Sequence, residues 1–157
     1  ESQSTDKGLI LKDLDSTQKL GASLVPQLSD FEILLLKGPL GAGKTALVQG
    51  LANGLGVSEP ITSPTFALAQ HYKGNNSVLI HMDLYRIDNS DSANELFLQE
   101  EEEANLHKAV LAIEWPERLD LRLPDAWFIQ LDYEPNGGRI AYIKKPQSEF
   151  KNFITSN

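Results

Sequence analysis

Residues 31–45 read FEILLLKGPLGAGKT, an apolar run followed at once by a glycine-rich turn. The apolar run, residues 31–37, is short and nearly continuous, which is typical of a strand buried on both faces in a parallel sheet. Beyond the turn, Gly54 and Gly56 end a segment in which apolar residues recur at helical spacing: Leu47, Val48, Leu51, Ala52 and Leu55. The sequence therefore predicts a strand, a loop and a helix in direct succession.

The glycine-rich octet, residues 38–45, matches the pattern G-x-x-x-x-G-K-[ST] of phosphate-binding loops. Glycine at the fixed positions lets the backbone approach a phosphate where a side chain would block it, and the N–H groups ahead of the helix form an anion cradle. Lys44 adds a positive charge for the β and γ phosphates, and the Thr45 hydroxyl can ligate magnesium. We therefore predict that ATP and Mg²⁺ bind at Gly38, Gly41, Ala42, Gly43, Lys44 and Thr45.

Two acidic residues are candidates to complete a hydrolytic site. Asp83 lies in a segment whose alternation places it on the same strand face as His81 and Tyr85, and Glu114 ends the apolar segment LAIE. Acids at the carboxyl ends of parallel strands face the ligand in open α/β sheets. Either acid alone could equally cap a turn, but together with the loop they favour a metal-binding or catalytic role. The sequence leaves open which one ligates the metal directly.

A polar turn, residues 63–65, precedes the first predicted hairpin strand. The Thr65 hydroxyl could sense the γ phosphate as a switch loop does, although a simple turn is nearly as good an interpretation. The predicted catalytic residues are therefore Lys44, Thr65, Asp83 and Glu114.

Two hairpins and further helices complete the expected fold. Residues 66–72 and 77–85 flank the turn KGNN, residues 126–133 and 139–144 flank NGG, residues 109–114 form a buried strand, and helices cover residues 93–106 and 147–153. This order predicts an α/β protein with the three-layer P-loop NTPase fold: a mixed parallel and antiparallel sheet flanked by helices. We expect one domain, residues 1–157.

The composition limits the ligands and the cellular location that we expect for this protein. The formal net charge is −8 and the pI is about 4.8. This negative charge repels nucleic-acid backbones, so we expect RNA or DNA to be reached only through a partner. There is no long apolar run, and there are no cysteines. We therefore expect a cytoplasmic protein without a membrane segment. The three histidines show no metal-ligand spacing, and the acidic run of residues 100–103 favours a solvated helix face.

Four motifs in fixed order resemble the TsaE/YjeE family of bacterial ATPases, which are needed to make threonylcarbamoyladenosine in tRNA. The resemblance extends from about Asp13 to Arg139. The motifs are GPLGAGKT (residues 38–45), TSPTF (residues 62–66), HMDLYR (residues 81–86) and EWPE (residues 114–117).

The resemblance implies roles for particular residues. Thr45 and Glu114 would ligate magnesium, with Asp83 at the metal or its water shell. Thr17 and Arg139 match family residues near the nucleotide base. Thr65 would lie in the switch-like loop, and Trp115 would pack beside the site, although a plain core tryptophan is an equal alternative.

The resemblance also implies partners, the TsaB and TsaD proteins, which together form a transferase complex. ATP hydrolysis would reset this complex between turnovers. The chain itself is expected to be a monomer with slow intrinsic ATPase activity. A small-molecule kinase is the first alternative, but kinases of this class clamp a second phosphate with several arginines, and this chain has four in all: Arg86, Arg118, Arg122 and Arg139. A nucleotide-dependent binding switch with little hydrolysis is the second alternative.

Overall fold

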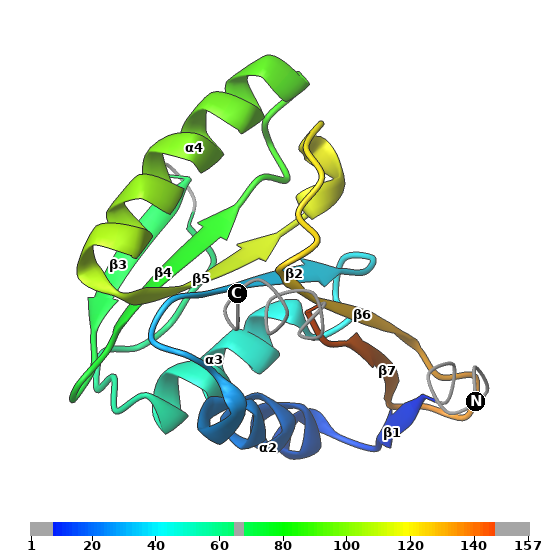
Figure 1. Cartoon of the computed structure of the whole chain (residues 1–157). Helices are drawn as coiled ribbons and strands as arrows, with labels where there is room; N and C mark the ends of the chain where they lie inside the picture. Colours follow the sequence, from blue (N-terminus) through cyan, green and yellow to red (C-terminus); the bar gives the residue numbers. More distant parts are fainter. Residues whose placement is uncertain (1–7, 65–67, 147–157) are drawn as a thin grey trace, which may run out of the picture.

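The computed structural model describes residues 8–64 and 68–146, which form a seven-stranded sheet in the order β1-β7-β6-β2-β5-β4-β3 (Figure 1). The central strands β6, β2, β5 and β4 run parallel to one another. On one side β7 pairs antiparallel with β6, and β1 pairs antiparallel with β7. On the other side β3 pairs antiparallel with β4. The strands are β1 (Leu9–Leu11), β2 (Glu32–Lys37), β3 (Ala69–Lys73), β4 (Val78–Asp83), β5 (Ala109–Glu114), β6 (Trp127–Tyr133) and β7 (Arg139–Lys144).

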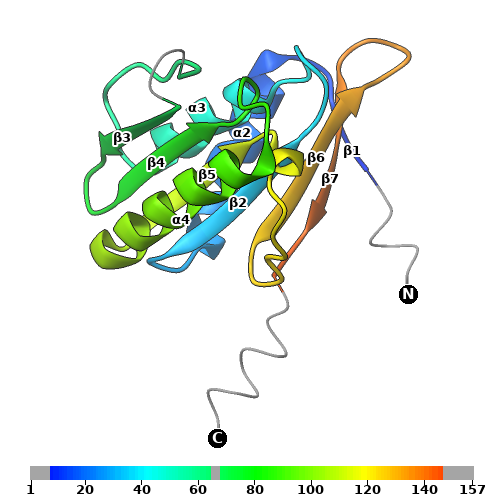
Figure 2. The same cartoon turned by 90° about the horizontal axis from the view of Figure 1, so that it is seen from above.

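Helices cover both faces of the sheet, as Figure 2 shows with α4 (Ser90–His107) on the near face and α2 (Leu14–Leu24) and α3 (Lys44–Gly54) behind it. Strand β2 contributes to both cores because its side chains alternate: Leu34 and Leu36 pack on the α3 side, and Ile33 packs on the α4 side. Two short 3-10 helices, η1 (Val25–Gln27) and η2 (Pro116–Arg118), follow α2 and β5. This confirms the predicted α/β fold with a mixed sheet and helices on both sides.

The register of the parallel strands determines which polar residues meet at their carboxyl ends. Asp83 at the end of β4 pairs with Glu114 at the end of β5, and Leu36 near the end of β2 pairs with Glu114 on its other side. The loop between β2 and α3 begins at this same edge. The two predicted acids and the glycine-rich loop are therefore brought together by the sheet itself.

Helix α2 and strand β1 were not predicted. Helix α2 begins with Asp13 as its N-cap, whose side chain accepts a hydrogen bond from the Ser16 N–H at 2.8 Å. Its buried residues are Thr17, Gly21 and Leu24, and Leu20 packs partly buried against the same core, so small residues interrupt the apolar face that packs inward. A Cβ on Gly21 would lie 2.2 Å from a carbonyl oxygen of α3. Close backbone packing thus replaces the apolar stripe that a sequence pattern could detect.

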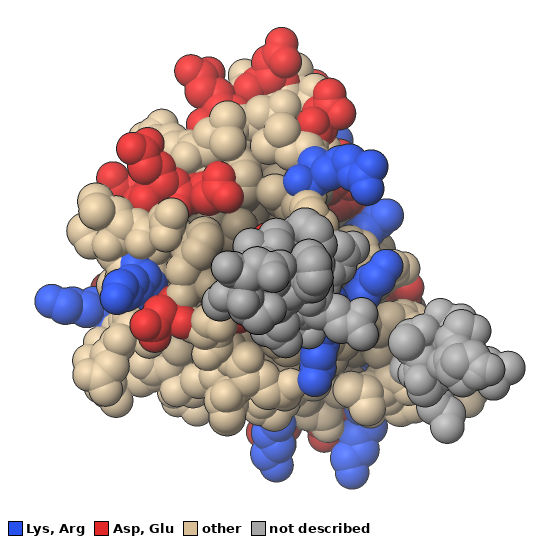
Figure 3. All heavy atoms as spheres, in the orientation of Figure 1, with Lys and Arg blue, Asp and Glu red and all other residues tan. Residues whose placement is uncertain are grey.

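One interpretation of the acidic run is wrong in part. Glu100 is buried, and its carboxylate lies 2.7 Å from Nε2 of His71 on the edge strand β3. The other acids of this run stay at the surface of α4, where acidic side chains gather in Figure 3. The helix predicted over residues 147–153 lies outside the described residues. Within those residues, none of the helices is long and apolar enough to cross a membrane.

Candidate nucleotide-binding site

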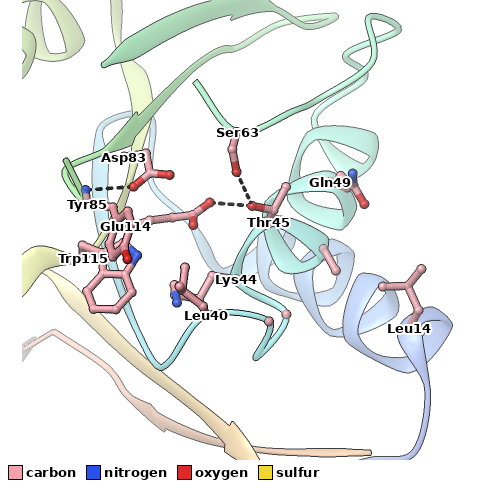
Figure 4. A pocket seen from close by; sticks show the side chains of 13 residues that line it. Leu14, Leu40, Lys44, Thr45, Gln49, Ser63, Asp83, Tyr85, Glu114 and Trp115 are labelled. Atoms are coloured by element: carbon pink, nitrogen blue, oxygen red, sulfur yellow. Dashed lines mark hydrogen bonds between the residues drawn. The ribbon is translucent and has the colours of Figure 1, made fainter. Parts of the chain in front are cut away.

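The glycine-rich loop lines a cavity of about 430 Å³ at the carboxyl end of the sheet (Figure 4). Gly41, Gly43, Lys44 and Thr45 contribute to its wall from the loop and the start of α3. The opposite wall comes from the ends of β4 and β5 and from the residues that follow them: Asp83, Tyr85, Glu114 and Trp115. The predicted loop and the two predicted acids therefore share one cavity.

Two glycines of the loop are required by its geometry. Gly43, the N-cap of α3, has a φ of 104°, which residues with a Cβ rarely adopt. A Cβ on Gly38 would lie 2.3 Å from the Leu131 carbonyl oxygen, so β6 could not pass this close to any other residue. The loop is thus kept narrow, with backbone rather than side chains at the start of the helix. This is the arrangement that accommodates an anion.

The Lys44 side chain is buried and turns back over the loop. Its Nζ donates hydrogen bonds to the Gly38 carbonyl oxygen and, at 2.9 Å, to the Pro39 carbonyl oxygen, and it lies 4.6 Å from the centre of the Trp115 ring. Burial lowers the pKa of the Lys44 ammonium, while the nearby carboxylates of Glu114, Glu117 and Asp83 act to raise it. The ammonium is therefore held inside the cavity wall, next to the acids.

A chain of hydrogen bonds runs from the loop between α3 and β3 to the end of β5. The Thr45 hydroxyl donates to Oε2 of Glu114 at 3.0 Å, and the Ser63 hydroxyl lies 2.9 Å from the same Thr45 oxygen (Figure 4). A carboxylate oxygen only accepts and a hydroxyl carries a single proton, so Ser63 is the donor to Thr45. The two residues that the family resemblance assigns to magnesium, Thr45 and Glu114, are therefore in direct contact.

His81 is a residue of this site to which the sequence analysis gave no role. Its Nε2 lies 2.8 Å from Oε2 of Glu114, and both side chains are almost completely buried. Since the carboxylate accepts, Nε2 is the donor of this hydrogen bond. The signal that could have found His81 is its position two residues before Asp83, on the same strand face. That spacing brings it level with Ala112, two residues before Glu114 on β5.

Asp83 faces the cavity beside Glu114 and accepts a hydrogen bond from the Tyr85 N–H at 3.0 Å. Burial raises the pKa of the Asp83 carboxyl above its ordinary value, and the charge of Glu114 raises it further. The backbone hydrogen bond from Tyr85, His81 and Lys44 act in the opposite direction. Two carboxylates side by side at a half-buried edge repel each other, and a cation between them would relieve that repulsion.

Trp115 lies beside the site rather than in a plain core position. It has a φ of 62°, a left-handed conformation that is costly for a residue with a large side chain. Its ring packs against Tyr85, with 4.9 Å between the ring centres, and lines the cavity under Lys44. The left-handed turn also ends β5 at Glu114 and allows Pro116 to start η2.

Thr17 and Arg139 line a second, adjoining cavity of about 240 Å³, which shares Leu14, Gly41 and Gly43 with the first. Thr17 is buried, and its methyl group would lie 3.4 Å from a Cβ on Gly43. Arg139 donates from Nε and Nη2 to the Gly41 carbonyl oxygen at 3.1 and 2.8 Å. The two residues that resemblance places near a nucleotide base therefore lie together, next to the loop.

The arrangement brings together nearly all of the predicted site residues. Gly38 and Ala42 form the body of the loop, where Ala42 is buried and its N–H donates to the Pro39 carbonyl oxygen at 3.1 Å. Thr65 lies outside the described residues. Among residues 8–64 and 68–146 no three His, Cys, Asp or Glu side chains form a metal cluster. One hydroxyl and two carboxylates are nevertheless the donor set that suits Mg²⁺, which keeps several waters and is also held by substrate phosphates.

The parallel strand order, the loop between β2 and α3 and the acids on the neighbouring strands define an α/β protein with the P-loop NTPase fold. The crystal structure of YdiB from Bacillus subtilis has the same fold, with a TM-score of 0.68 and 22% sequence identity over 96% of this chain and 93% of YdiB.

Sequence comparison identifies the family. The model of the family described as threonylcarbamoyl adenosine biosynthesis protein TsaE matches residues 11–141, and the chain belongs to this family. The tRNA threonylcarbamoyladenosine biosynthesis protein TsaE of Nostoc sp. is 38% identical over 86% of this chain and 83% of its own length. The protein of the same name from Synechocystis sp. is 42% identical over 69% of each chain, and that of Aquifex aeolicus is 39% identical over 71% of this chain and 78% of its own.

Proposed function

We propose that this TsaE-family protein binds ATP with Mg²⁺ in the main cavity and hydrolyses it, as the ATPase component of tRNA threonylcarbamoyladenosine modification. The observation that carries this proposal is the meeting of Lys44, Thr45, Asp83 and Glu114 around one cavity at the carboxyl end of the sheet. The proposal includes the expectation that the described residues are part of one ATPase domain.

Binding is supported by the chemistry of the loop. Gly41 and Gly43 line the cavity without side chains, which leaves room for a phosphate at the positive end of α3, and Lys44 supplies a charge from inside the cavity wall. Thr17 and Arg139 in the adjoining cavity would take the nucleoside end of the ligand. An ATP molecule would then extend across both cavities.

Hydrolysis is supported by the acids. Thr45, Glu114 and Asp83 would hold Mg²⁺, which when bound neutralises charge on the phosphate oxygens. Glu114 is fixed by hydrogen bonds from Thr45 and His81, while Asp83 has one backbone donor and faces the cavity. Glu114 is therefore the better-oriented direct ligand, and Asp83 is left to act on the metal's water shell. In the predicted site, Thr65 would complete the contacts to the γ phosphate.

Membership of the family supports a proposal about the partners. We propose that hydrolysis is coupled to turnover of a complex of TsaB and TsaD, and that tRNA is contacted through those proteins. The net charge of −8 supports this division, because it opposes direct binding of a polyanion. We expect the chain to act in the cytoplasm, as a monomer before it meets its partners.

The arginines argue against the kinase alternative. The Arg118 Nη2 group donates to the Tyr85 carbonyl oxygen at 2.9 Å, and Arg139 is bound to the Gly41 carbonyl oxygen. Arg122 lines a different cavity, together with Phe31. These three guanidinium groups therefore do not converge on a place for a second phosphate substrate. The second alternative, a nucleotide-dependent binding switch, differs from our proposal only in its lower rate of ATP hydrolysis.

The test is a comparison of wild type with Lys44→Ala. Calorimetry with a non-hydrolysable ATP analogue and Mg²⁺ should give at least about tenfold weaker binding for Lys44→Ala, because a charge-assisted contact is lost. Lys73→Ala, which removes an exposed lysine from the end of β3, should bind as wild type does. Absence of binding by wild type would refute the proposal.

Coupling is tested separately, by phosphate release with TsaB, TsaD and tRNA present. Wild type should release phosphate faster with the partners than alone, and Lys44→Ala should support no modification beyond a first turnover. Equal turnover of the modification reaction with Lys44→Ala would contradict coupling while leaving nucleotide binding intact.

A further inference from the structure

The first part of the glycine-rich loop is held by its carbonyl oxygens, which are bound from two different directions. Lys44 binds those of Gly38 and Pro39 from inside the loop. The Tyr133 hydroxyl donates to the Leu40 carbonyl oxygen, and the Arg139 guanidinium donates to that of Gly41. Four consecutive carbonyl groups are thus fixed, two of them by residues that lie more than ninety positions further along the chain.

These contacts act on a β-turn. The Ala42 N–H donates to the Pro39 carbonyl oxygen at 3.1 Å, which closes a turn with Leu40 and Gly41 at its centre. Gly41 has a φ of 79°, the value of the third residue of a type II turn. Types I and II differ mainly by a flip of the central peptide, here the one between Leu40 and Gly41. The carbonyl group that Tyr133 binds belongs to this peptide.

A trans peptide is planar, so its carbonyl and N–H groups point in opposite directions. When Tyr133 holds the Leu40 carbonyl group, the Gly41 N–H must point away from the β6–β7 hairpin. If this peptide flipped, the Leu40 carbonyl oxygen would take the place of the Gly41 N–H on the side away from the hairpin. The oxygen would repel a phosphate there. The hydroxyl of Tyr133 therefore selects the turn that offers an N–H group to an anion.

We propose that Tyr133 and Arg139 are positioning residues, which hold the loop in its anion-binding conformation from outside before any ligand arrives. Their effect on ligand affinity rests on the proposed function. The two residues are paired directly across the hairpin, and the Arg139 guanidinium lies 5.0 Å from the centre of the Tyr133 ring. Arg139 is further fixed by a 2.7 Å hydrogen bond to the Gly138 carbonyl oxygen. Tyr133 and Arg139 together thus hold the carbonyl groups of two successive residues, Leu40 and Gly41.

Tyr133 separates positioning from direct contact. Arg139 lines the second cavity and could touch a nucleotide itself, whereas Tyr133 is not among the described residues that line either cavity. Tyr133→Phe removes one hydroxyl and keeps the ring that packs on Arg139. Tyr142→Phe is a matched control on the same hairpin, because no hydrogen bond among residues 8–64 and 68–146 involves the Tyr142 hydroxyl.

The experiment measures the NOE between the Leu40 Hα and the Gly41 amide proton by NMR, and ligand binding by calorimetry, on the full chain. Without ligand, Tyr133→Phe should weaken this NOE, which is strong in a type II turn, because loss of one hydrogen bond shifts the population of the flipped peptide by roughly three- to tenfold. ADP and inorganic pyrophosphate should both bind about three- to tenfold more weakly, by the same factor, because the defect lies in the phosphate loop. Tyr142→Phe should match wild type in all three measurements.

An unchanged Leu40–Gly41 NOE in Tyr133→Phe would overturn the proposal, whatever the ligand data show. A weakened NOE with unchanged binding of both ligands would also overturn it, since the conformation would then not limit affinity. If wild type binds neither ADP nor pyrophosphate, the proposed nucleotide function fails, and the NOE still decides whether Tyr133 holds the loop.

Discussion

Two histidine–glutamate pairs in this protein have almost the same geometry and different surroundings. His81 and Glu114 lie 2.8 Å apart on neighbouring strands at the carboxyl end of the sheet, with 0% and 4% of their side chains exposed. His71 and Glu100 lie 2.7 Å apart between β3 and α4, with 45% and 11% exposed. The distance between the paired atoms therefore does not distinguish a site component from a surface contact.

Burial and further partners make the difference. Glu114 accepts from Thr45 as well as from His81 and lines the main cavity, so its orientation is fixed by two donors. His71 is half exposed to water, which screens the charge of its partner and competes for its hydrogen bond. The first pair orients side chains at the edge of the main cavity, and the second joins a helix to an edge strand.

The acids of the two pairs should give the largest contrast. Glu114→Ala removes a proposed metal ligand and leaves the His81 N–H and the Thr45 hydroxyl without their acceptor. We expect binding of an ATP analogue in the presence of Mg²⁺ to weaken by about a hundredfold or more, since even residues that only support metal ligands are worth 10- to 100-fold. Calorimetry with Mg²⁺ and with EDTA measures this effect.

Glu100→Ala is the matched change in the other pair. It should leave nucleotide affinity within about twofold of wild type, because α4 lies on the opposite face of the sheet from the loop helix. Equal affinities of Glu114→Ala and wild type with Mg²⁺ present would remove Glu114 from the ligand set and erase the distinction between the pairs.

The histidines should give a smaller contrast. His81→Leu places an apolar side chain in a fully buried position and deprives the Glu114 carboxylate of one donor. The loss should lower the unfolding free energy by about 1–3 kcal/mol. His81 Nδ1 has no partner among the described residues, so its loss adds nothing to this cost. Phosphate release should fall by about 10- to 100-fold, as for other residues that orient a metal ligand.

Two further variants show where the effect of His81 arises. His81→Gln can still donate from its amide and should recover part of the lost activity. His71→Leu should lower the unfolding free energy by no more than about 1 kcal/mol, measured by urea denaturation, because His71 is about half exposed and water competes for its hydrogen bond to Glu100. Equal losses of activity for His81→Leu and His81→Gln would argue that His81 acts through packing alone.

The sequence predicted the parts of the site that local pattern determines. The loop, α3 and the acid at the end of β5 each follow from a motif or an apolar run, and the strands Ala109–Glu114 and Arg139–Lys144 match their predicted bounds. The rule that parallel strands bring their carboxyl ends to one edge predicted that the acids face the loop, whereas the direct pairing of Asp83 with Glu114 is known from the structure alone.

The sequence did not predict contacts made by packing between distant segments. Helix α2 buries small residues against α3, and a Cβ on Gly50 would lie 1.8 Å from the Gln18 carbonyl oxygen, so this contact depends on a close backbone approach that an apolar pattern does not reveal. The Tyr133 contact to Leu40 joins residues far apart in the chain. Glu100 was predicted to be solvated with its acidic neighbours, since only the position of β3 shows that His71 covers it.

Asp83 gives the smallest and most unusual effect, a gain of stability. Burial raises the pKa of its carboxyl in the folded protein above the ordinary value of 3.8, and the neighbouring Glu114 charge adds to this. The folded state thus disfavours the ionised form, so the contribution of Asp83 to stability is fully present below pH 3.8 and is lost as the pH rises through the raised pKa. At pH 7 the wild type bears the full free-energy cost of burying the ionised Asp83 carboxylate, and Asp83→Asn removes this cost.

We therefore expect Asp83→Asn to raise Tm by about 1–3 °C at pH 7, in the range of a small single-residue effect for a chain of this size. The gain should shrink as the pH is lowered towards 3.8, because the wild-type carboxyl takes up its proton above that ordinary value. Asp125→Asn, at an exposed position before β6, should leave Tm unchanged at both pH values. A lower Tm for Asp83→Asn at pH 7 would mean that attraction to Lys44 and His81 outweighs burial. The cavity edge would then resemble the surface pair rather than a site whose charges are held at a cost to stability.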